Sequence, residues 1–302
     1  MSQRFLVMGD NHGDTESLRR VLNDVEDHRL DFAVHVGDFT RAWRRNRELG
    51  VEHLRAVEPL LERIDDETRH GLAWVWGNQD YFGDLDYDLD VGTEIPDDDC
   101  VTVGGQRFTN APALVEEDVV LVTHMETWSL VDHIDGKAHF CGNTHRGRQK
   151  GRRLNAAFLQ VTDPETDTTT YGGYFVVEID DGSFEVEVRS IGDLERTTCD
   201  RHGERGVQFH PASRECMYCE DEQVLMREMA ASAFYGLTKD ADEDAVSEAD
   251  LVAYAVDLWE TPPDGFRQDF RQYVATLEDD RYAPLMHDDD GRVVVADESY
   301  AY

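Results

Sequence analysis

Short polar motifs follow apolar, strand-like segments throughout the first half of the chain, and this alternation limits the possible folds more than any other feature. Gly9–Gly13, Gly37-Asp38 and Gly77–Asp80 each come directly after such a segment. Between them, apolar residues recur at helical spacing over 15–25 and 48–64. A βαβαβ beginning predicts a mostly parallel sheet, with the chemistry at the carboxyl ends of its strands.

After Cys100 the pattern changes to short strands without intervening helices. The strands are expected at 101–103, 107–110, 119–122, 138–141, 155–161, 174–179 and 184–188, with a polar hairpin loop over 163–170. They predict a second sheet that packs on the first as a sandwich, so that the catalytic unit ends near Ile191.

Two further motifs continue the series, Thr123-His124 and Gly142-Asn143-Thr144-His145, and both follow apolar segments. Hydrolysis of a phosphoester needs a nucleophile at neutral pH and compensation for the charge on the phosphoryl oxygens. Two cations about 3.5–4 Å apart supply both. A carboxylate between the metals, with oxygen or imidazole ligands on either side, is the donor set for such a site.

The ordered motifs Asp10-x-His12, Gly37-Asp38, Gly77-Asn78, His124 and Gly142–His145 resemble those of the calcineurin-like metallophosphoesterase family, especially its small phosphodiesterase branch. The resemblance covers about 5–191. It implies a four-layer α/β/β/α sandwich, two divalent ions (Mn²⁺ or similar) and in-line attack by a metal-bridging hydroxide on a phosphoester substrate. A phosphodiesterase is the expected enzyme, whereas nothing in the sequence identifies the phosphopeptide groove of a protein phosphatase.

The same resemblance assigns ligands to individual residues. Asp10, His12 and His145 would hold the first metal and Asp38 would bridge, while Asn78 and His124 would hold the second metal. The residues expected to act in catalysis are therefore Asp38, Asn78 and His124.

The chain departs from the family pattern at two positions. Asn143 stands where the last motif has its first histidine, a ligand of the second metal, and a carboxamide oxygen binds a transition metal more weakly than imidazole. Gln79 stands where many members have a histidine that protonates the leaving group, and glutamine cannot titrate. The second metal site is expected to be labile. The alternative function is a metal-binding regulatory or interaction protein in which catalysis has faded.

Arginine gathers in two runs that follow metal motifs, 41–47 and 146–153. Guanidinium groups bind phosphate in bidentate fashion. Arg41, Arg44, Arg146 and Arg148 are therefore candidates for binding the phosphate of a nucleotide or nucleic acid near the mouth of the site. The alternative is that these arginines pair with neighbouring acidic residues.

Beyond Ile191 the chain contains two pairs of soft ligands, Cys199-x-x-His202 and Cys216-x-x-Cys219. Four such ligands suit a structural tetrahedral Zn²⁺, with His210 as a possible substitute for His202. Reduced thiols that pack, or a redox-active Cys-x-x-Cys, are the alternatives. Helices are expected at 222–235, 248–259 and 266–277. The predicted division is a catalytic domain at 1–191, a zinc-knuckle segment at 192–220 and an acidic helical extension at 221–302.

The formal net charge is -36, and only three lysines contribute to the 29 basic residues. Self-repulsion of this size destabilises a compact state unless salt screens it, which favours a halophile's cytosolic protein over an ordinary acidic one. We expect neither a signal peptide nor a membrane span, and the odd number of cysteines argues against a disulfide framework. The oligomeric state and the physiological substrate are not readable from these features.

Overall fold

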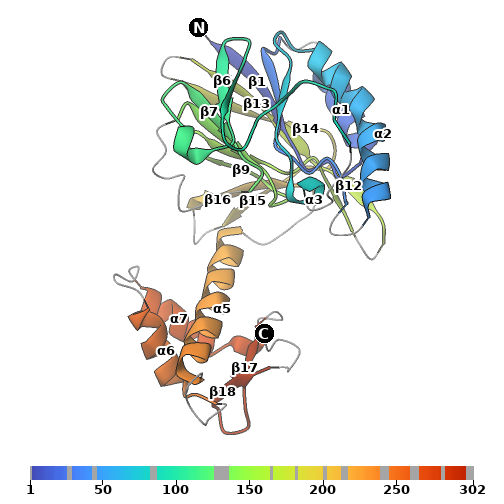
Figure 1. The fold of residues 1–302 in the computed structure, drawn as a ribbon. Helices are drawn as coiled ribbons and strands as arrows, with labels where there is room; N and C mark the ends of the chain where they lie inside the picture. Colours follow the sequence, from blue (N-terminus) through green and yellow to red (C-terminus); the bar gives the residue numbers. More distant parts are fainter. Residues whose placement is uncertain are drawn as a thin grey trace. The chain divides into compact units, whose positions relative to one another are not determined.

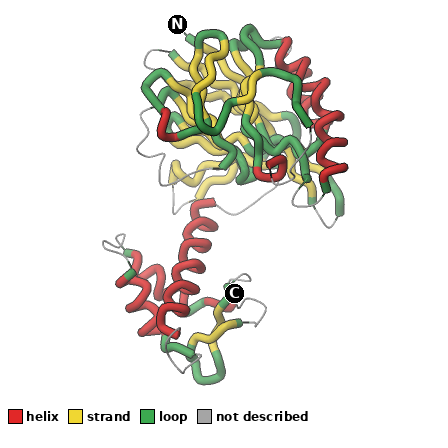
Figure 2. Tube along the Cα trace, viewed as in Figure 1, coloured by secondary structure: helices red, strands yellow, loops and turns green. Residues whose placement is uncertain are grey.

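A computed structural model describes residues 2–25, 29–42, 46–81, 87–125, 136–163, 166–180, 183–199, 203–211, 217–238, 245–258, 265–279 and 283–296. The chain divides into two compact units, Met1–Cys216 and Met217–Tyr302. Strands dominate the first unit and helices dominate the second (Figure 2).

The first sheet of the first unit has the strand order β14-β13-β1-β2-β3-β4. Its strands are β1 (Gln3–Met8), β2 (Phe32–His35), β3 (Leu72–Trp74), β4 (Thr93–Glu94), β13 (Gly173–Ile179) and β14 (Phe184–Ser190). Strands β1 to β4 are mutually parallel, and β13 pairs antiparallel with β1. The carboxyl ends of β1, β2 and β3, each followed by a polar motif, therefore lie at one edge.

Helices α1 (Thr15–Val25) and α2 (Arg47–Asp66) cover one face of this sheet (Figure 1). Helix α1 buries Leu18, Val21, Leu22 and Val25, the apolar stripe that the sequence predicts. Asp14 accepts a hydrogen bond from the backbone N–H of Ser17 at 2.6 Å, so a carboxylate caps the first turn directly after the β1 motif. The first turn of α1 thus holds the chain in place directly after the Gly9–Gly13 motif.

The second sheet has the strand order β15-β16-β9-β10-β8-β7-β6-β5. Its strands are β5 (Cys100–Val103), β6 (Gln106–Thr109), β7 (Val119–Val122), β8 (Ala138–Cys141), β9 (Gly147–Lys150), β10 (Arg153–Ala156), β15 (Glu195–Cys199) and β16 (Gly203–His210). A core of buried side chains from both sheets, including Phe5, Phe32, Phe108 and Phe140, fills the space between them. The two large sheets and the helices on the first confirm the predicted α/β sandwich.

Several shorter elements complete the first unit, namely α3 (Asn78–Tyr81), the 3₁₀ turn η1 (Pro112–Leu114), β11 (Gln160–Thr162) and β12 (Thr169–Tyr171). The hairpin β11–β12 lies where a hairpin loop was predicted over 163–170, but the loop is shorter than expected, because Thr169 and Thr170 already pair in β12. The strand expected over 155–161 is wrong as one element, because the chain leaves β10 at Ala156 and resumes pairing in β11 at Gln160. Strands β9, β15 and β16 lie where no strand was expected.

Strands β15 and β16 extend the second sheet beyond Ile191, so the first compact unit continues to Cys216. The division into a catalytic domain that ends at 191, a zinc-knuckle segment that ends at 220 and a helical extension stays a prediction.

The second unit comprises α5 (Met217–Thr238), α6 (Glu248–Asp257), α7 (Phe266–Val274), the 3₁₀ turn η2 (Leu277–Asp279) and the hairpin β17 (Leu285–His287) with β18 (Val293–Val295). It has its own apolar core, which includes Phe234, Leu251, Phe270 and Val293. The three predicted helices are confirmed, with α5 beginning earlier than expected. Among the described residues, no helix combines the length and apolarity needed to cross a membrane.

Candidate metal centre

The turns that follow β1 and β2 are hydrogen-bonded to each other. The backbone N–H of Asp10 donates to the carbonyl of Gly37 at 3.0 Å, and that of His12 donates to the carbonyl of Asp38, also at 3.0 Å. Gly37 has φ +95°, and a Cβ there would meet Gly77 N at 2.7 Å, so only glycine allows this close approach. The two turns therefore present Asp10, His12 and Asp38 together.

Most of the predicted ligands have an unusual backbone. Positive φ values are found at Asp10 (58°), His12 (49°), Asp38 (56°), Asn143 (71°) and His145 (55°). Asp167 is the only other non-glycine residue with a positive φ among the described parts of the chain. Left-handed conformations cost a non-glycine residue about 1–2 kcal/mol and cluster at functional sites, where the surrounding structure enforces them. Their concentration here marks these turns as a site.

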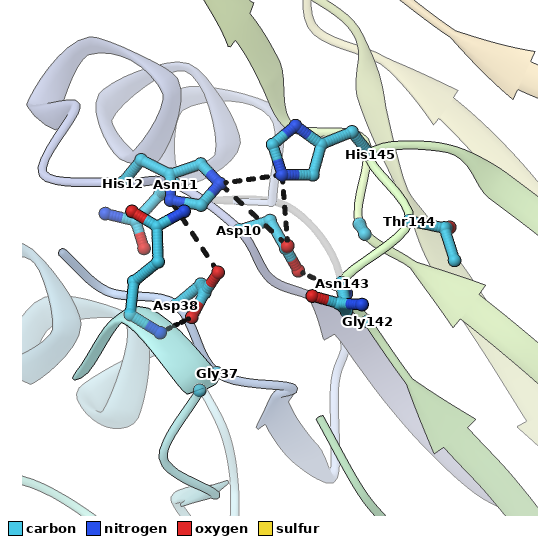
Figure 3. Close-up of polar contacts among 12 residues, drawn as sticks. Asp10, Asn11, His12, Gly37, Asp38, Gly142, Asn143, Thr144 and His145 are labelled. Atoms are coloured by element: carbon cyan, nitrogen blue, oxygen red, sulfur yellow. Dashed lines mark hydrogen bonds and ion pairs between the residues drawn. The ribbon is translucent and has the colours of Figure 1, made fainter. Parts of the chain in front are cut away.

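Three acceptors converge in a first cluster of Asp10, His12 and His145 (Figure 3). The Nε2 atoms of His12 and His145 are 3.2 Å apart, and each lies 3.9 Å from Oδ1 of Asp10. Nδ1 of His12 lies 3.1 Å from the carbonyl of Thr40, which can only accept, so Nε2 carries the lone pair. Oδ1 of Asp10 is buried and finds no hydrogen-bond donor among the described residues. This donor set fits a divalent cation.

A second cluster joins Asp38, Asn78 and His124. Nε2 of His124 is 2.7 Å from Oδ1 of Asn78 and 3.4 Å from Oδ1 of Asp38. Nδ1 of His124 lies 2.8 Å from the carbonyl of Val36 and must donate to it, which again leaves Nε2 facing oxygen acceptors. Acceptors that face one another need a proton or a metal ion between them, so this cluster also fits a cation.

Asp10 lies close enough to Asp38 and His124 to share a metal with them as well. Asp10 therefore belongs to two possible ligand groups, one with His12 and His145 and one with Asp38 and His124. The bridging position that the family resemblance assigns to Asp38 could thus involve Asp10 as well. The clusters draw on residues that follow β1, β2 and β3 in the first sheet and β7 and β8 in the second. The site thus lies where the two sheets meet (Figure 3).

Without a metal, the charged groups compensate one another. Burial raises the pKa of Asp10 to about 8. Burial alone would lower the pKa of His124, but its hydrogen bond to Asp38 and the charges of Asp10 and Asp38 raise it to about 9. Burial tends to raise the pKa of Asp38, and the hydrogen bond and charge of His124 reverse that direction. In metal-free protein, Asp10 and His124 are therefore both largely protonated at neutral pH.

The two departures from the family pattern lie beside the clusters. The backbone N–H of Asn143 donates to Oδ2 of Asp10 at 3.3 Å, and the backbone N–H of Gln79 donates to Oδ1 of Asp38 at 2.9 Å. Both residues therefore orient a carboxylate through their main chain, which does not depend on their side-chain identity.

Two buried groups next to the ligands were not predicted as part of the site. Asp80 accepts hydrogen bonds from the backbone N–H groups of Phe39, Thr40 and Gly77 at 2.9–3.0 Å. It ties the β2 turn to the β3 turn, and burial raises its pKa to about 6. His35 is buried, and it hydrogen-bonds to Asn11, the residue between the ligands Asp10 and His12. The position of His35 two residues before Gly37 was the available signal for a role in the site.

The arginines differ from one another in exposure. Arg41 is exposed, whereas Arg146 and Arg148 are each 2% exposed, and Arg148 lies within β9. Arg44 lies outside the described residues. Burial limits the contact that Arg146 and Arg148 have with solvent, so their role in substrate binding stays a prediction.

The predicted zinc ligands are only partly described. Cys199 ends β15 opposite Gly203 in β16, and Cys219 lies in the first turn of α5. His202 and Cys216 lie outside the described residues. His210 is fully buried, with Nε2 2.6 Å from Oγ1 of Thr197. The zinc site stays a prediction.

Comparison with known proteins places the first unit in a family. The family model described as calcineurin-like phosphoesterase matches residues 3–166, more than half of the chain. No curated protein matches the sequence.

Several solved structures show weak likeness to the chain. A conserved uncharacterized protein from Streptococcus pneumoniae, a predicted phosphoesterase, is 20% identical with a TM-score of 0.38, over 63% of this chain and 91% of that one. A novel archaeal phosphodiesterase is 14% identical (TM-score 0.35, 62% and 100%), and the E. coli phosphoesterase Yfce is 15% identical (TM-score 0.32, 70% and 100%).

Proposed function

The chain belongs to the calcineurin-like phosphoesterase family, whose members hydrolyse phosphoesters with divalent metals, and on that premise we propose that it is a phosphodiesterase acting on a nucleotide or nucleic-acid substrate. The observation that carries the proposal is a pair of possible ligand groups that share Asp10 where the two sheets meet, namely Asp10, His12 and His145, and Asp10, Asp38 and His124. Asp10, His12 and His145 would hold one ion, and Asp38, Asn78 and His124 a second. Asn143 would contribute weakly to the second.

When bound, two divalent ions would acidify a water molecule and neutralise charge on the phosphoryl oxygens. The chain's own residues prepare that chemistry. The Gln79 N–H fixes one oxygen of Asp38 at 2.9 Å, and the Val36 carbonyl fixes the tautomer of His124. Burial of Asp10, Asp38 and His124 lowers the local dielectric, which strengthens every charge interaction within the site.

A nucleotide or nucleic-acid substrate is proposed from the arginine runs. Arg41 is exposed and follows Thr40, whose carbonyl holds His12, so its guanidinium is the best-supported contact for a substrate phosphate. Arg44, Arg146 and Arg148 remain candidates for the same role.

The test is hydrolysis of bis-p-nitrophenyl phosphate with added Mn²⁺ in concentrated KCl. Wild type should turn over, and Asp38→Asn should lose at least about 100-fold in rate, because the neutral amide removes a metal-binding charge. The matched control is Asp167→Asn, the same exchange at a left-handed residue in the β11–β12 hairpin, which should retain wild-type activity. Nucleotide diesters and monoesters would then be compared. Equal turnover by wild type and Asp38→Asn would contradict the proposal.

A metal-binding regulatory protein is the second candidate, and Asn143 and Gln79 favour it. Its signature would be folded protein that binds Mn²⁺ yet hydrolyses neither diesters nor monoesters with any divalent ion.

We also propose a structural zinc site formed by Cys199, His202, Cys216 and Cys219, supported by the spacing of the ligands in the sequence. Purified protein should retain one zinc per chain after mild chelation, and Cys216→Ser should lose it without loss of Mn²⁺ binding. If wild-type protein without zinc were as stable as zinc-loaded protein, the result would favour the alternative of packed or redox-active thiols.

A further inference from the structure

A continuous relay of hydrogen bonds runs behind the metal ligands through His35 and Asn11. The backbone N–H of Gly37 donates to Nδ1 of His35 at 3.2 Å. Nε2 of His35 lies 3.0 Å from Oδ1 of Asn11, and Nδ2 of Asn11 donates to the carbonyl of Phe39 at 3.4 Å. The relay therefore begins at the residue before Asp38 and ends at the residue after it.

The direction of each bond in the relay is determined. A backbone N–H can only donate, so Nδ1 of His35 must accept, and the ring proton must be on Nε2. That proton is donated to Asn11 Oδ1, which leaves the amide nitrogen of Asn11 to donate to the Phe39 carbonyl. Every member has a complementary partner, and no reversal of the tautomer satisfies the same contacts.

The relay is fully enclosed. Asn11 and His35 are both 0% exposed, so water cannot replace a lost partner. The ring of His35 stacks on Phe39 with centroids 4.0 Å apart and an interplanar angle of 13°. Nε2 of Gln160 donates to the carbonyl of Asn11 at 3.3 Å, which holds the same turn from another side. The position of Asn11 is thus defined by packing and by hydrogen bonds.

The relay passes beside the residues whose backbone is strained. Asn11 lies between Asp10 and His12, and Asp38 lies between Gly37 and Phe39. Asp10, His12 and Asp38 all have φ between 49° and 58°. Residues keep such conformations only where their surroundings enforce them. His35 is in neither of the possible ligand groups found among the described residues, and both polar side-chain atoms of Asn11 are engaged in the relay.

We propose that His35 is a positioning residue that, through Asn11, holds Asp10, His12 and Asp38 in their left-handed conformations and thereby sets the affinity of the site for divalent metal. The proposal rests on the metal centre of the proposed function but not on its catalytic activity. Groups that orient metal ligands typically change affinity by 10–100-fold when removed.

The decisive variant is His35→Phe, which keeps a ring to stack on Phe39 and removes both hydrogen bonds. Its dissociation constant for Mn²⁺, measured by calorimetry in concentrated KCl, should rise 10–100-fold over that of wild type. His35→Gln keeps a donor for Asn11 and should recover part of the loss. The matched control is Val34→Ala in the same strand, which leaves a cavity in the core between the sheets and should lower stability without changing the dissociation constant.

A substitution at the second member of the relay, Asn11, tests the relay itself. Asn11→Leu should weaken Mn²⁺ binding as His35→Phe does, and the double variant should be no weaker than the worse single variant, because both cut one relay. Wild-type protein provides a readout that needs no variant. Nitrogen NMR of the imidazole should show a neutral His35 protonated at Nε2, with a proton that exchanges slowly.

Unchanged Mn²⁺ affinity in folded His35→Phe, additive losses in the double variant, or a wild-type His35 protonated at Nδ1 would each overturn the proposal. Wild type that binds no Mn²⁺ would overturn the metal centre itself and is therefore distinguishable from failure of the relay. Wild type that binds Mn²⁺ without hydrolysing diesters would leave the relay standing and contradict only the phosphodiesterase.

Discussion

At the scale of single residues, the metal centre consists of acceptors held in place by donors behind them. Val36 and Thr40 carbonyls fix the tautomers of His124 and His12, and main-chain N–H groups of Gln79 and Asn143 fix two carboxylates. The other ring nitrogens of these histidines and the carboxylate oxygens therefore direct their lone pairs into the centre. In metal-free protein, protons must offset this negative charge.

Metal binding should therefore release protons. The pKa of Asp10 is raised to about 8 and that of His124 to about 9, so both groups are largely protonated at pH 7 and must lose their protons to bind metal. Mn²⁺ affinity should rise between pH 6 and 9. Calorimetry in two buffers of different ionisation enthalpy measures the number of protons released. An affinity independent of pH over this range would show that the two groups are already deprotonated.

Asn143→His should strengthen the second metal site, because imidazole binds a transition metal better than a carboxamide oxygen. Histidine is among the side chains that adopt positive φ more readily, so the 71° at this position is tolerable. Metal retained after dialysis should increase from nearly one towards two Mn²⁺ per chain. Unchanged retention would mean that position 143 does not face the second ion. New diesterase activity in an otherwise inert protein would support the regulatory candidate for the natural chain.

At the scale of elements, the closeness of neighbouring turns is what aligns the ligands. A Cβ at Gly77 would lie 2.1 Å from both the backbone nitrogen and Oδ1 of Asp38. The β3 turn thus packs directly against the bridging carboxylate, and the Asp80 carboxylate joins the two turns from behind.

Gly77→Ala should displace Asp38 and weaken Mn²⁺ binding at least about tenfold, since contacts under 3.0 Å force the backbone to move. The matched control is Gly151→Ala in the β9–β10 turn, where φ is 58° and the added methyl group meets nothing within 4 Å. That variant should lose about 1–2 kcal/mol of stability and keep its metal affinity. Metal titrations and urea unfolding on both proteins make the comparison. Equal affinities would show that the turn adapts.

The elements that carry the ligands were predictable because each has a strong local pattern. The expected helix over 15–25 coincides with α1, and the motifs indicated which turns would meet. Strand β9 escaped prediction because its polar sequence is typical of a surface, whereas it pairs with β10 and with β16 and Arg148 is buried. The left-handed turns and the relay through His35 depend on contacts between distant segments, which local periodicity does not encode.

At the scale of the whole molecule, the charge of -36 acts on both compact units. Acidic side chains far outnumber their basic partners, 65 against 29, so most cannot form ion pairs and repel one another. Such repulsion is long-range in dilute salt, where the screening length is about 10 Å at 0.1 M, and it falls to about 3 Å at 1 M.

Stability should therefore rise steeply with salt. The midpoint of thermal unfolding is expected to increase by more than about 10 °C between 0.1 M and 2 M KCl, whereas an uncharged osmolyte at equal osmolality should produce less. Calorimetry of the intact chain provides the measurement. A midpoint that does not change with KCl would contradict the interpretation of a chain adapted to concentrated salt.

The meeting of ligands from both sheets has a further consequence for the topology of the unfolded chain. His12 and His145 are 133 residues apart in sequence. An ion that stays bound to both during partial unfolding would act as a reversible cross-link around a loop of that size. A permanent tie around a loop of about 100 residues removes close to 5 kcal/mol of chain entropy from the unfolded state. Availability of metal in the cell would then govern how long the protein survives proteolysis, independently of how fast it turns over substrate.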